Sequence, residues 1–388
     1  MMMAVKAAAA IATIGLVYII AFTSAETALA FTNARARSSI FASPDSEKSI
    51  IISPHLQHDR AKQSSSRNRS STRILSYRKF HDYGWNKLMS ENDTELDTVP
   101  EELTSNTSPA KGALPGTNIV ANIRSISQFP LLAADKKGTD NHEVLRLARS
   151  ALLETQSPTS EALITPMTVH VLNFVLFPSP HIHDGNCNDN ENGEYLGLPI
   201  FGADIVSLPG NKHLVALDFQ PVLPLGDDDG VGSNGKEKSS LFPQQYLHLE
   251  KKLQTIHSKY QKSNSDSAPL LPWGGDIPQQ AKRFFSPYAL WTRLSDENAI
   301  DTVDTVVWQA FQEYIDVYME LMSAVQNDVN AGKLGLGAQT DSNNPVLKGQ
   351  MDYLEYRRTN DPARPMLQRL YGNEWAESVI GDVLFPDL

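Results

Sequence analysis

Three stretches of the chain decide the fold: MTVHVLNFVLF (167–177), LPIFGADIVSL (198–208) and HLVALDFQ (213–220). In each stretch, apolar residues fill both alternating sets of positions instead of only one. This pattern is typical of strands in the middle of a sheet, because such strands are covered on both faces. The tripeptide PGN (209–211) between the second and third stretches is a tight-turn signal, so these two strands are predicted to form a hairpin.

Helical patterns dominate the rest of the sequence. Apolar residues recur there at three- and four-residue steps, which is the spacing of one helix face. Helices are expected from Ser76 onward and over residues 243–260, 302–329, 346–359 and 374–384, with a short one ending at Gly372. Residues 90–118 are polar and rich in proline, serine, threonine and asparagine, so they are expected to form a loop. Strands followed by helices indicate an α+β domain.

Composition excludes several classes of protein. The chain has 388 residues, of which 41% are apolar and 20% charged, as in a globular protein with a sizeable core. The formal net charge is −11, which argues against a nucleic-acid or anionic-membrane partner because such binding needs a basic face. Cys187 is the only cysteine, so the chain cannot build an internal disulfide or a cysteine-ligated iron–sulfur cluster.

The N-terminal residues read as a targeting leader. Residues 1–30 combine Lys6, an uncharged apolar run and an A-x-A pattern at 28–30, which are the features of a signal peptide. The apolar run over 7–22 is shorter than the ~20 residues that span a membrane. Residues 31–73 are rich in serine and arginine and hold eight Lys/Arg against three Asp/Glu, as in a transit peptide.

A signal followed by a transit-like segment, with Phe31 at the junction, resembles the two-part leader of plastid proteins in algae with secondary plastids. The alternative is a disordered linker of a secreted protein. We therefore expect a plastid location, no membrane contact after processing, and a folded domain over residues 74–388.

Three polar residues lie inside the apolar strands: Asn173, Asp204 and Asp218. A carboxyl group on an apolar sheet loses its hydration, which disfavours the ionised form and raises its pKa. Such a carboxyl can donate a proton near neutral pH, as a general acid must. The alternative is that each carboxyl is structural and is satisfied by backbone donors or by an arginine.

Asp361 is a fourth candidate, because it lies at a helix break in RRTNDPAR (357–364). Its structural alternative is an N-cap role, since Asp suits the N-cap and Pro362 suits the first helical position. Arg357 lies four residues earlier on the same helical face, where it can orient Asp361 or bind an anionic group of a substrate.

Other motifs in the sequence give little evidence of function. The sequence has no glycine-rich nucleotide-binding motif and no G-x-S-x-G nucleophile motif. His181 and His183 precede Asp184, and residues 227–229 are three aspartates, but both groups lie in polar loops. No metal site is expected from either group.

Several blocks of the sequence resemble the ferredoxin-dependent bilin reductases. In chain order they are VLNFVLFP (171–178), LPIFGADIVSLPG (198–210), HLVALDFQPVLP (213–224), PWGGDI (272–277), FFSPYALWTR (284–293), YLEYRRTNDPARPMLQRLYGNEWAE (353–377) and LFPDL (384–388). The parts that match weakly are residues 90–160 and 181–194.

This resemblance implies a three-layer α/β/α sandwich with a central antiparallel sheet, as the catalytic domain over residues 74–388. It also implies an oxidoreductase that reduces an open-chain tetrapyrrole, a bilin, between the sheet and the helices. Electrons arrive singly from reduced ferredoxin, so the protein binds no cofactor or metal of its own, and side chains supply the protons. The expected partners are ferredoxin and the bilin. Whether product passes to another bilin reductase or to a lyase is left open.

The resemblance also implies roles for single residues. Asp204 matches the family's central aspartate, a proton donor that contacts the pyrrole nitrogens. Asp361 matches a second aspartate on the helical side, and Arg357 matches an arginine one turn before it. Asn173 stands where the phycocyanobilin-forming branch has a histidine, and asparagine is what the branches forming phycoerythrobilin and phytochromobilin carry there. Glu154 is only a loose match to a glutamate of the phycocyanobilin branch.

Within the family, FGADIVSLPG and HLVALDFQP look most like the branch that reduces the A-ring diene of 15,16-dihydrobiliverdin to phycoerythrobilin. Two alternatives stay open: reduction of the 15,16 bridge of biliverdin to 15,16-dihydrobiliverdin, and a bilin-binding protein that does not reduce its pigment. Acids at both Asp204 and Asp361 argue against a pure binder, because binding alone needs no proton donors.

Ferredoxin docking is expected on a local basic patch. Plant-type ferredoxins are acidic, and this chain is also acidic overall, so the two net negative charges oppose association. The patch expected from the sequence consists of Lys251, Lys252, Lys259, Lys282 and Arg283.

Overall fold

The computed structural model describes residues 76–386 apart from 91–95, 98, 105, 110–115, 127–143, 157–168, 186–193, 209, 226–239, 262–267 and 337–342. The two leader segments predicted from the sequence, 1–30 and 31–73, lie outside the described residues. So do Cys187 and the aspartates at 227–229.

An antiparallel sheet of seven strands, in the order β1-β2-β3-β4-β6-β7-β8, forms the centre of the described residues. The strands are β1 (Thr107–Pro109), β2 (Asn118–Ile126), β3 (Leu145–Gln156), β4 (His170–Pro178), β6 (Ile200–Leu208), β7 (Lys212–Gln220) and β8 (Leu290–Leu294). Each strand pairs antiparallel with its neighbours. Two short strands, β5 (Ile182–Asp184) and β9 (Leu334–Leu336), form a separate ribbon.

The predicted hairpin is confirmed by the pairing of β6 with β7. Leu208 lies opposite Lys212, so the connection is tight. Gly210 and Asn211 have φ angles of 88° and 60° there. Glycine and asparagine adopt this left-handed region at little energetic cost. Gly210 and Asn211 can therefore form the tight turn between β6 and β7.

Four strands of the central sheet were not predicted from the sequence, and neither were the two short strands β5 and β9. β1 lies within the predicted loop 90–118, together with the short helix α3 (Glu101–Thr104), so that prediction was wrong. β3 is almost completely buried but contains Arg149, Ser150 and Glu154, which interrupt its apolar run. β2 and β8 were missed because their buried and partly exposed residues alternate, so neither strand reads as a continuous apolar run.

The predicted helices are confirmed. The longer ones are α2 (Arg78–Ser90), α4 (Leu247–Gln261), α7 (Trp308–Asn330), α8 (Pro345–Asn360), α9 (Arg364–Tyr371) and α10 (Asn373–Ser378). Short helices α5 (Gln279–Lys282) and α6 (Ala299–Thr302), one 3-10 turn (Gln244–Tyr246) and π-helical turns at Val303–Val307 and Val379–Leu384 complete them. α8 ends before Asp361-Pro362, as a proline at that position requires.

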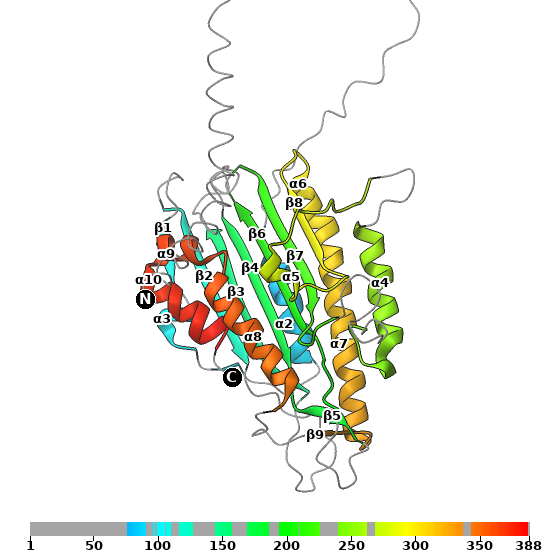
Figure 1. The fold of residues 1–388 in the computed structure, drawn as a ribbon. Coiled ribbons are helices and arrows are strands. Elements are labelled where there is room, and N and C mark those ends of the chain that lie inside the picture. Colours follow the sequence, from blue (N-terminus) through cyan, green and yellow to red (C-terminus); the bar gives the residue numbers. More distant parts are fainter. Residues whose placement is uncertain are drawn as a thin grey trace, which may run out of the picture. The chain divides into compact units, whose positions relative to one another are not determined.

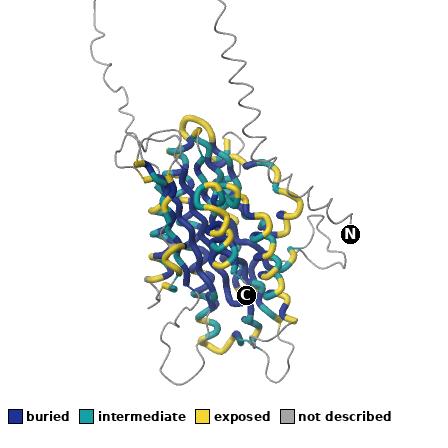
Figure 2. The backbone as a smooth tube through the Cα atoms, turned by 90° about the vertical axis from the view of Figure 1, so that its left-hand side faces the viewer, coloured by how far each residue is buried: buried dark blue, intermediate teal, exposed yellow. Residues whose placement is uncertain are grey.

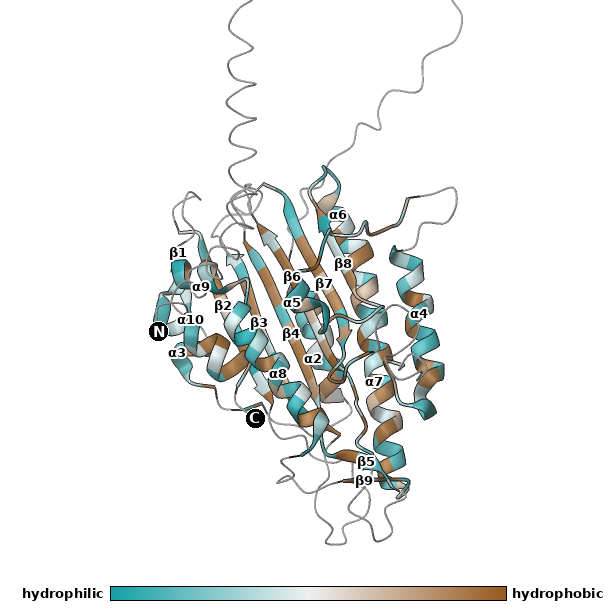
Figure 3. Cartoon of the chain, viewed as in Figure 1, coloured by the Kyte–Doolittle hydropathy of each residue, from teal (hydrophilic) through white to brown (hydrophobic). Residues whose placement is uncertain are grey.

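Two apolar cores lie on opposite faces of the sheet, which confirms the three-layer sandwich (Figure 1). One core joins the sheet to α2, α4 and α7, and contains Phe174 in contact with Trp85 and Phe311. The other joins the sheet to α8, α9 and α10. Figure 2 shows the buried strands inside a shell of partly exposed helices and exposed turns. Hydrophobic segments run along the central strands in Figure 3.

Helices leave part of the α8-side face of the sheet accessible. β4 is buried along its whole length, whereas every second residue of β6, β7 and β8 near the hairpin is partly exposed. The register places these residues in two rows across the strands, Asp204–Ala216–Trp291 and Val206–Leu214–Arg293. We call these six residues the open strip.

Among the described residues, no helix has the length and apolarity to cross a membrane.

Candidate functional site

Asn173 and Asp204 lie directly opposite each other on β4 and β6. Directly opposed residues of antiparallel strands share one face with their Cβ atoms close together, so their side chains meet. Asn173 Nδ2 donates a hydrogen bond to Asp204 Oδ1. Asp204 keeps 33% of its side chain exposed. Asn173 therefore orients a carboxyl that is still accessible at the edge of the open strip.

Arg357 reaches down from α8 onto this carboxyl. Its Nη1 lies 2.9 Å from Asp204 Oδ2 and its Nη2 lies 3.5 Å from Asp204 Oδ1, an approach that uses both guanidinium prongs. The guanidinium also lies over the ring of Phe385, 4.7 Å from the ring centroid. Burial works against the charge of Arg357, but Asp204 and further groups, among them Asp361, raise its pKa, so it stays cationic.

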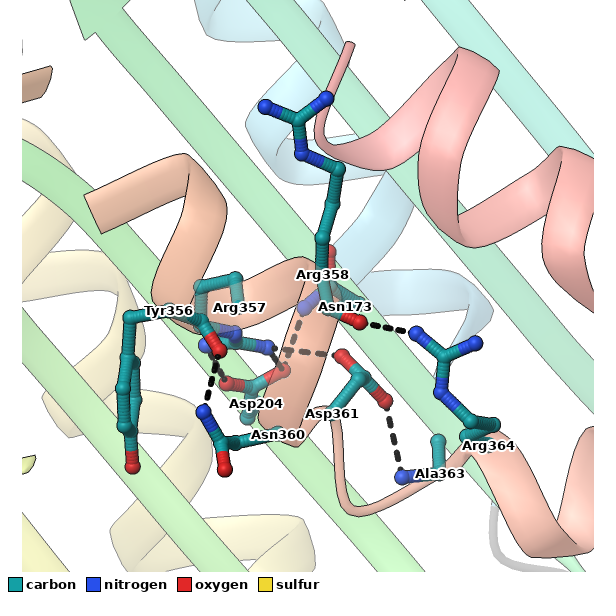
Figure 4. Close-up of polar contacts among 9 residues, drawn as sticks. All are labelled: Asn173, Asp204, Tyr356, Arg357, Arg358, Asn360, Asp361, Ala363 and Arg364. Carbon is teal, nitrogen blue, oxygen red and sulfur yellow. Dashed lines mark hydrogen bonds and ion pairs between the residues drawn. The ribbon is translucent and has the colours of Figure 1, made fainter. Parts of the chain in front are cut away.

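Asp361 accepts from the same arginine, with Arg357 Nη2 at 3.4 Å from its Oδ2 (Figure 4). The side chain of Asp361 is only 5% exposed. Burial raises the pKa of Asp361, and the positive charge of Arg357 limits the rise. Arg357 thus links the sheet carboxyl of Asp204 to the helix-end carboxyl of Asp361.

The cap role expected for Asp361 is found in part. Its Oδ1 accepts a hydrogen bond of 2.8 Å from the backbone N–H of Ala363, so it closes the turn after α8. However, α9 begins at Arg364 and not at Pro362, and its N-cap residue is Ala363. Asp361 therefore caps the turn, and its second oxygen is left for Arg357.

Three buried polar atoms around this cluster lack a hydrogen-bond partner within the described part of the chain: Asn173 Oδ1, Tyr353 Oη and Arg357 Nε. Tyr353 lies one helical turn before Arg357, and its electrostatic neighbours include Asp204 and Asp361. Buried polar atoms are nearly always paired in folded proteins, so unpaired ones mark a place where water or a ligand belongs. Asn173 and Arg357 bind the carboxyl of Asp204 directly, and Asp204 also acts electrostatically on Tyr353.

Two other acidic residues do not join the cluster. Asp218 lies on the same face of the sheet but accepts from the backbone N–H and the hydroxyl of Ser286, at 3.0 and 2.5 Å, so its structural alternative holds. Burial raises the pKa of Asp218 to about 7, as the sequence predicted for a desolvated carboxyl. Glu154 projects from the opposite face of the sheet, where it binds Ser76 and Arg78, so this loosely matched residue does not lie in the cluster around Asp204.

Trp291 and Arg293 share the open strip with Asp204 and were not singled out from the sequence. Both lie in the FFSPYALWTR block, and the alternation of buried and partly exposed residues in β8 is the signal that would have found them. As for metals, no group of three or more His, Cys, Asp or Glu within the described ranges is placed to hold an ion, and His183 lies on β5, outside the central sheet.

The expected basic patch is largely neutralised. Lys252 and Lys259 on α4 pair with Glu320 and Glu313 on α7, each at 2.5 Å. Arg283 pairs with Asp352 at 3.3 Å. Lys251 and Lys282 are exposed. The patch therefore carries less positive charge than its five residues suggest.

Comparison with known proteins gives the class to which this fold and site belong. The sequence model of the family described as ferredoxin-dependent bilin reductase matches residues 161–386, more than half of the chain. The chain belongs to the ferredoxin-dependent bilin reductase family.

Its curated relatives include proteins named phycoerythrobilin:ferredoxin oxidoreductase. That of Prochlorococcus marinus (strain MIT 9211) is 40% identical over 189 residues, which cover 48% of this chain and 60% of the relative. Those of Nostoc punctiforme and Gloeobacter violaceus are 37% and 36% identical, over 56% of this chain and 66% and 68% of their own lengths. The chain thus spans about two thirds of the length of these relatives or less.

A solved structure shares the fold. Phytochromobilin synthase from tomato, crystallised in complex with biliverdin, aligns with a TM-score of 0.50 over 80% of this chain and 83% of its own, at 24% identity. At this identity the likeness is one of fold alone.

Proposed function

We propose that this protein reduces an open-chain tetrapyrrole with electrons from ferredoxin. The proposed reaction is reduction of the A-ring diene of 15,16-dihydrobiliverdin to phycoerythrobilin. Support comes from family membership and from relatives that are named phycoerythrobilin:ferredoxin oxidoreductase. Asn173 on β4 adds to this support, because the resemblance associates asparagine there with the branches that form phycoerythrobilin and phytochromobilin.

The observation that carries the proposal is the open strip with Asp204 at its edge. Val206, Leu214, Ala216 and Trp291 give the strip an apolar floor that only partly exposed side chains line. A flat conjugated pigment can bury its rings on such a floor, while its pyrrole N–H groups need an acceptor. Asp204 offers that acceptor with a third of its side chain exposed. Small-molecule sites generally combine an apolar lining with a few polar groups in this way.

Protons for the reaction come from the same cluster in our proposal. Reduction of one double bond consumes two electrons and two protons, and ferredoxin delivers one electron at a time. Asp204 touches the pigment and donates a proton to it. Asp361, whose pKa burial raises, holds a proton beyond Arg357. Arg357 fixes the positions of both carboxyls, and Asn173 fixes the orientation of the first.

The test is anaerobic turnover of 15,16-dihydrobiliverdin with reduced ferredoxin, followed by absorption spectra. Asp204→Asn keeps the shape and removes the titratable proton, so it should bind pigment and lose on the order of 10²-fold or more in turnover. Asp361→Asn should bind pigment and change the product or the extent of reduction. Asp218→Asn is the matched control, because Asp218 is an aspartate of the same face whose carboxyl is held by Ser286. Normal turnover and normal product from a folded Asp204→Asn protein would refute the mechanism.

The same assay separates the alternatives. Consumption of biliverdin with accumulation of 15,16-dihydrobiliverdin would assign the protein to the preceding step, reduction of the 15,16 bridge. Tight binding of both pigments without reduction would make it a carrier or lyase, to which another reductase would supply product.

Electron supply and location are part of the proposal. We propose that the protein works without a bound flavin or metal, that ferredoxin docks by charge, and that the site of action is a plastid. Turnover should fall as the salt concentration rises, because salt screens the docking charges. A turnover rate that is the same at low and at physiological ionic strength would exclude charge-driven docking. Residues 1–75 fused to a fluorescent protein should direct it to plastids, and a secreted or cytosolic fusion would contradict that location.

A further inference from the structure

The guanidinium of Arg357 packs against an aromatic ring as well as against two carboxyls. Its central carbon lies over the ring of Phe385, 4.7 Å from the ring centroid. This ring is fully buried and meets the ring of Tyr353 edge-on, with the two centroids 6.3 Å apart. A ring face attracts a cation more strongly when both are shielded from water. Arg357 is therefore held by Asp204, by Asp361 and by this ring.

The ring of Phe385 is presented by an unusual turn of the chain. Phe385 directly follows the π-helical turn Val379–Leu384 and is its C-cap residue. The backbone N–H of Phe385 donates a 3.0 Å hydrogen bond to the carbonyl of Ile380, which fixes the end of the turn. Such turns are rare and are found frequently at functional sites.

A second arginine, Arg149 of β3, ties this turn to the sheet. Arg149 Nε donates a 2.9 Å hydrogen bond to the carbonyl of Val383 within the turn. Arg149 Nη1 lies 3.2 Å from Asp97 Oδ2, and the same oxygen accepts a hydrogen bond from Ser125 of β2. Arg149 is itself buried, so these partners hold it firmly in one position. The turn that carries Phe385 is thus anchored on two strands.

These contacts connect the sheet to the carboxyl of Asp204 through Phe385. Arg149 fixes the turn, and the turn places Phe385 against Arg357. Arg357 binds Asp204 with both terminal nitrogens, at 2.9 and 3.5 Å (Figure 4). Within the described residues, Arg357 Nε has no hydrogen-bond partner that would hold the plane of the guanidinium. The ring of Phe385 therefore limits how far the guanidinium can rotate away from Asp204.

We propose that Phe385 is a positioning residue of the reaction, which holds the guanidinium of Arg357 in the orientation that directs Asp204 toward the pigment. The inference rests on the proposed function, in which Asp204 donates a proton to the bilin. Because Phe385 is fully buried, it acts through Arg357 and not by contact with the pigment. Misplacement of a reacting group by about 1 Å can cost on the order of 10²-fold in rate. Loss of the ring should therefore lower kcat and leave binding almost unchanged.

The experiment measures kcat and KM for 15,16-dihydrobiliverdin with reduced ferredoxin, per folded molecule. Phe385→Leu keeps an apolar side chain without a ring face, so kcat should fall at least about tenfold while KM changes less than about twofold. Phe177→Leu is the matched control, because Phe177 is also fully buried in the same core and also packs edge-on against Tyr353. In the described structure Phe177 lies under no arginine, so this variant should lose stability but keep kcat.

A double variant shows whether Phe385 acts through Arg357. In an Arg357→Met background, Phe385→Leu should cause no further fall in kcat, because the group that it positions is gone. A further fall as large as in the wild-type background would overturn the inference. So would a normal kcat in Phe385→Leu alone, or an equal fall of kcat in Phe177→Leu.

Pentafluorophenylalanine at position 385 decides if Phe385→Leu does not fold or if Arg357→Met has no measurable turnover. It keeps the shape of the ring and reverses the charge distribution that attracts a cation. It should lower kcat as leucine does, and a normal kcat would refute the inference while the reductase activity stands. A wild type that reduces neither 15,16-dihydrobiliverdin nor biliverdin would instead refute the proposed function, and the inference would fail with it.

Discussion

Replacement of Arg357 by methionine tests the cluster most directly. Met has a similar length and no charge, so Arg357→Met leaves the packing near α8 filled and removes the cation between Asp204 and Asp361. Removal of one partner from a buried ion pair costs roughly 3–5 kcal/mol, because the remaining charge is left without compensation. The cost falls mainly on Asp361, whose side chain is 5% exposed. Asp204 is 33% exposed, so water screens it and it adds little.

Thermal unfolding measures this loss. The folded unit Thr72–Leu388 is larger than most single domains. At about 2.1 cal/mol/K of unfolding entropy per residue, one kcal/mol shifts its Tm by roughly 1.5 °C, so the variant should melt about 4–8 °C lower at pH 8. The difference should shrink at pH 5. Burial already raises the pKa of Asp361, and without Arg357 it rises further, so the penalty is present above that folded pKa and vanishes as the carboxyl takes up its proton.

Arg283→Met is the matched control, since Arg283 pairs with Asp352 and the two side chains are 61% and 44% exposed. An exposed pair contributes about 0–1 kcal/mol, so this variant should melt close to the wild type at both pH values. Equal melting temperatures for the two variants at pH 8 would refute the argument. So would a loss in Arg357→Met that is the same at pH 5 and pH 8.

Three further predictions concern the fold. Burial raises the pKa of Asp218 to about 7, so the wild type should lose stability as the pH rises from about 4 to 7. Asp218→Asn should not show this loss. In thermal scans up to pH 8, the Tm of the variant should therefore rise relative to that of the wild type. Burial lowers the pKa of His170 to about 4, so the wild type should lose stability as the pH falls from about 6.5 to 4, and His170→Gln should flatten that slope in acid titrations followed by circular dichroism. Phe174 is fully buried between Trp85 and Phe311, so Phe174→Ala should lower the free energy of unfolding by about 3–5 kcal/mol in urea titrations.

The central strands were predictable because a strand that is buried on both faces has a continuous run of apolar residues. β4 and the β6–β7 hairpin have that run, and the GN turn confirms their register. β3 lacks it, because its polar residues are satisfied by distant partners. Arg149 binds Asp97 and the carbonyl of Val383, and Ser150 accepts from Trp85. These partners are far away in the sequence, so the residues around β3 do not indicate them. The polar residues therefore make β3 look like an exposed segment.

The site was predictable residue by residue but not as a cluster. Asp204 and Asp361 were singled out because each departs from its local pattern. The bond from Arg357 to Asp204 joins residues 153 positions apart, and only the packing of α8 on the sheet brings them together. The alternation of β8 likewise carries no functional meaning until β7 and β6 align it with Asp204. Periodicity places a side chain on a face, whereas the register across strands decides which faces combine.

The charges of the cluster give a physical reason for the raised pKa of Asp361. Two carboxyls and one guanidinium carry a net negative charge when all are ionised, and burial disfavours that state. Protonation of one carboxyl makes the cluster neutral, and the deeply buried Asp361 has the raised pKa that this requires. Arg357 prevents the other extreme, because a permanent cation favours one ionised carboxyl beside it. Without an arginine, two buried aspartates would both tend to be neutral. With two arginines beside them, both would tend to be ionised. One arginine between two carboxyls therefore favours one ionised and one neutral carboxyl, and the raised pKa of Asp361 has the direction that this arrangement gives.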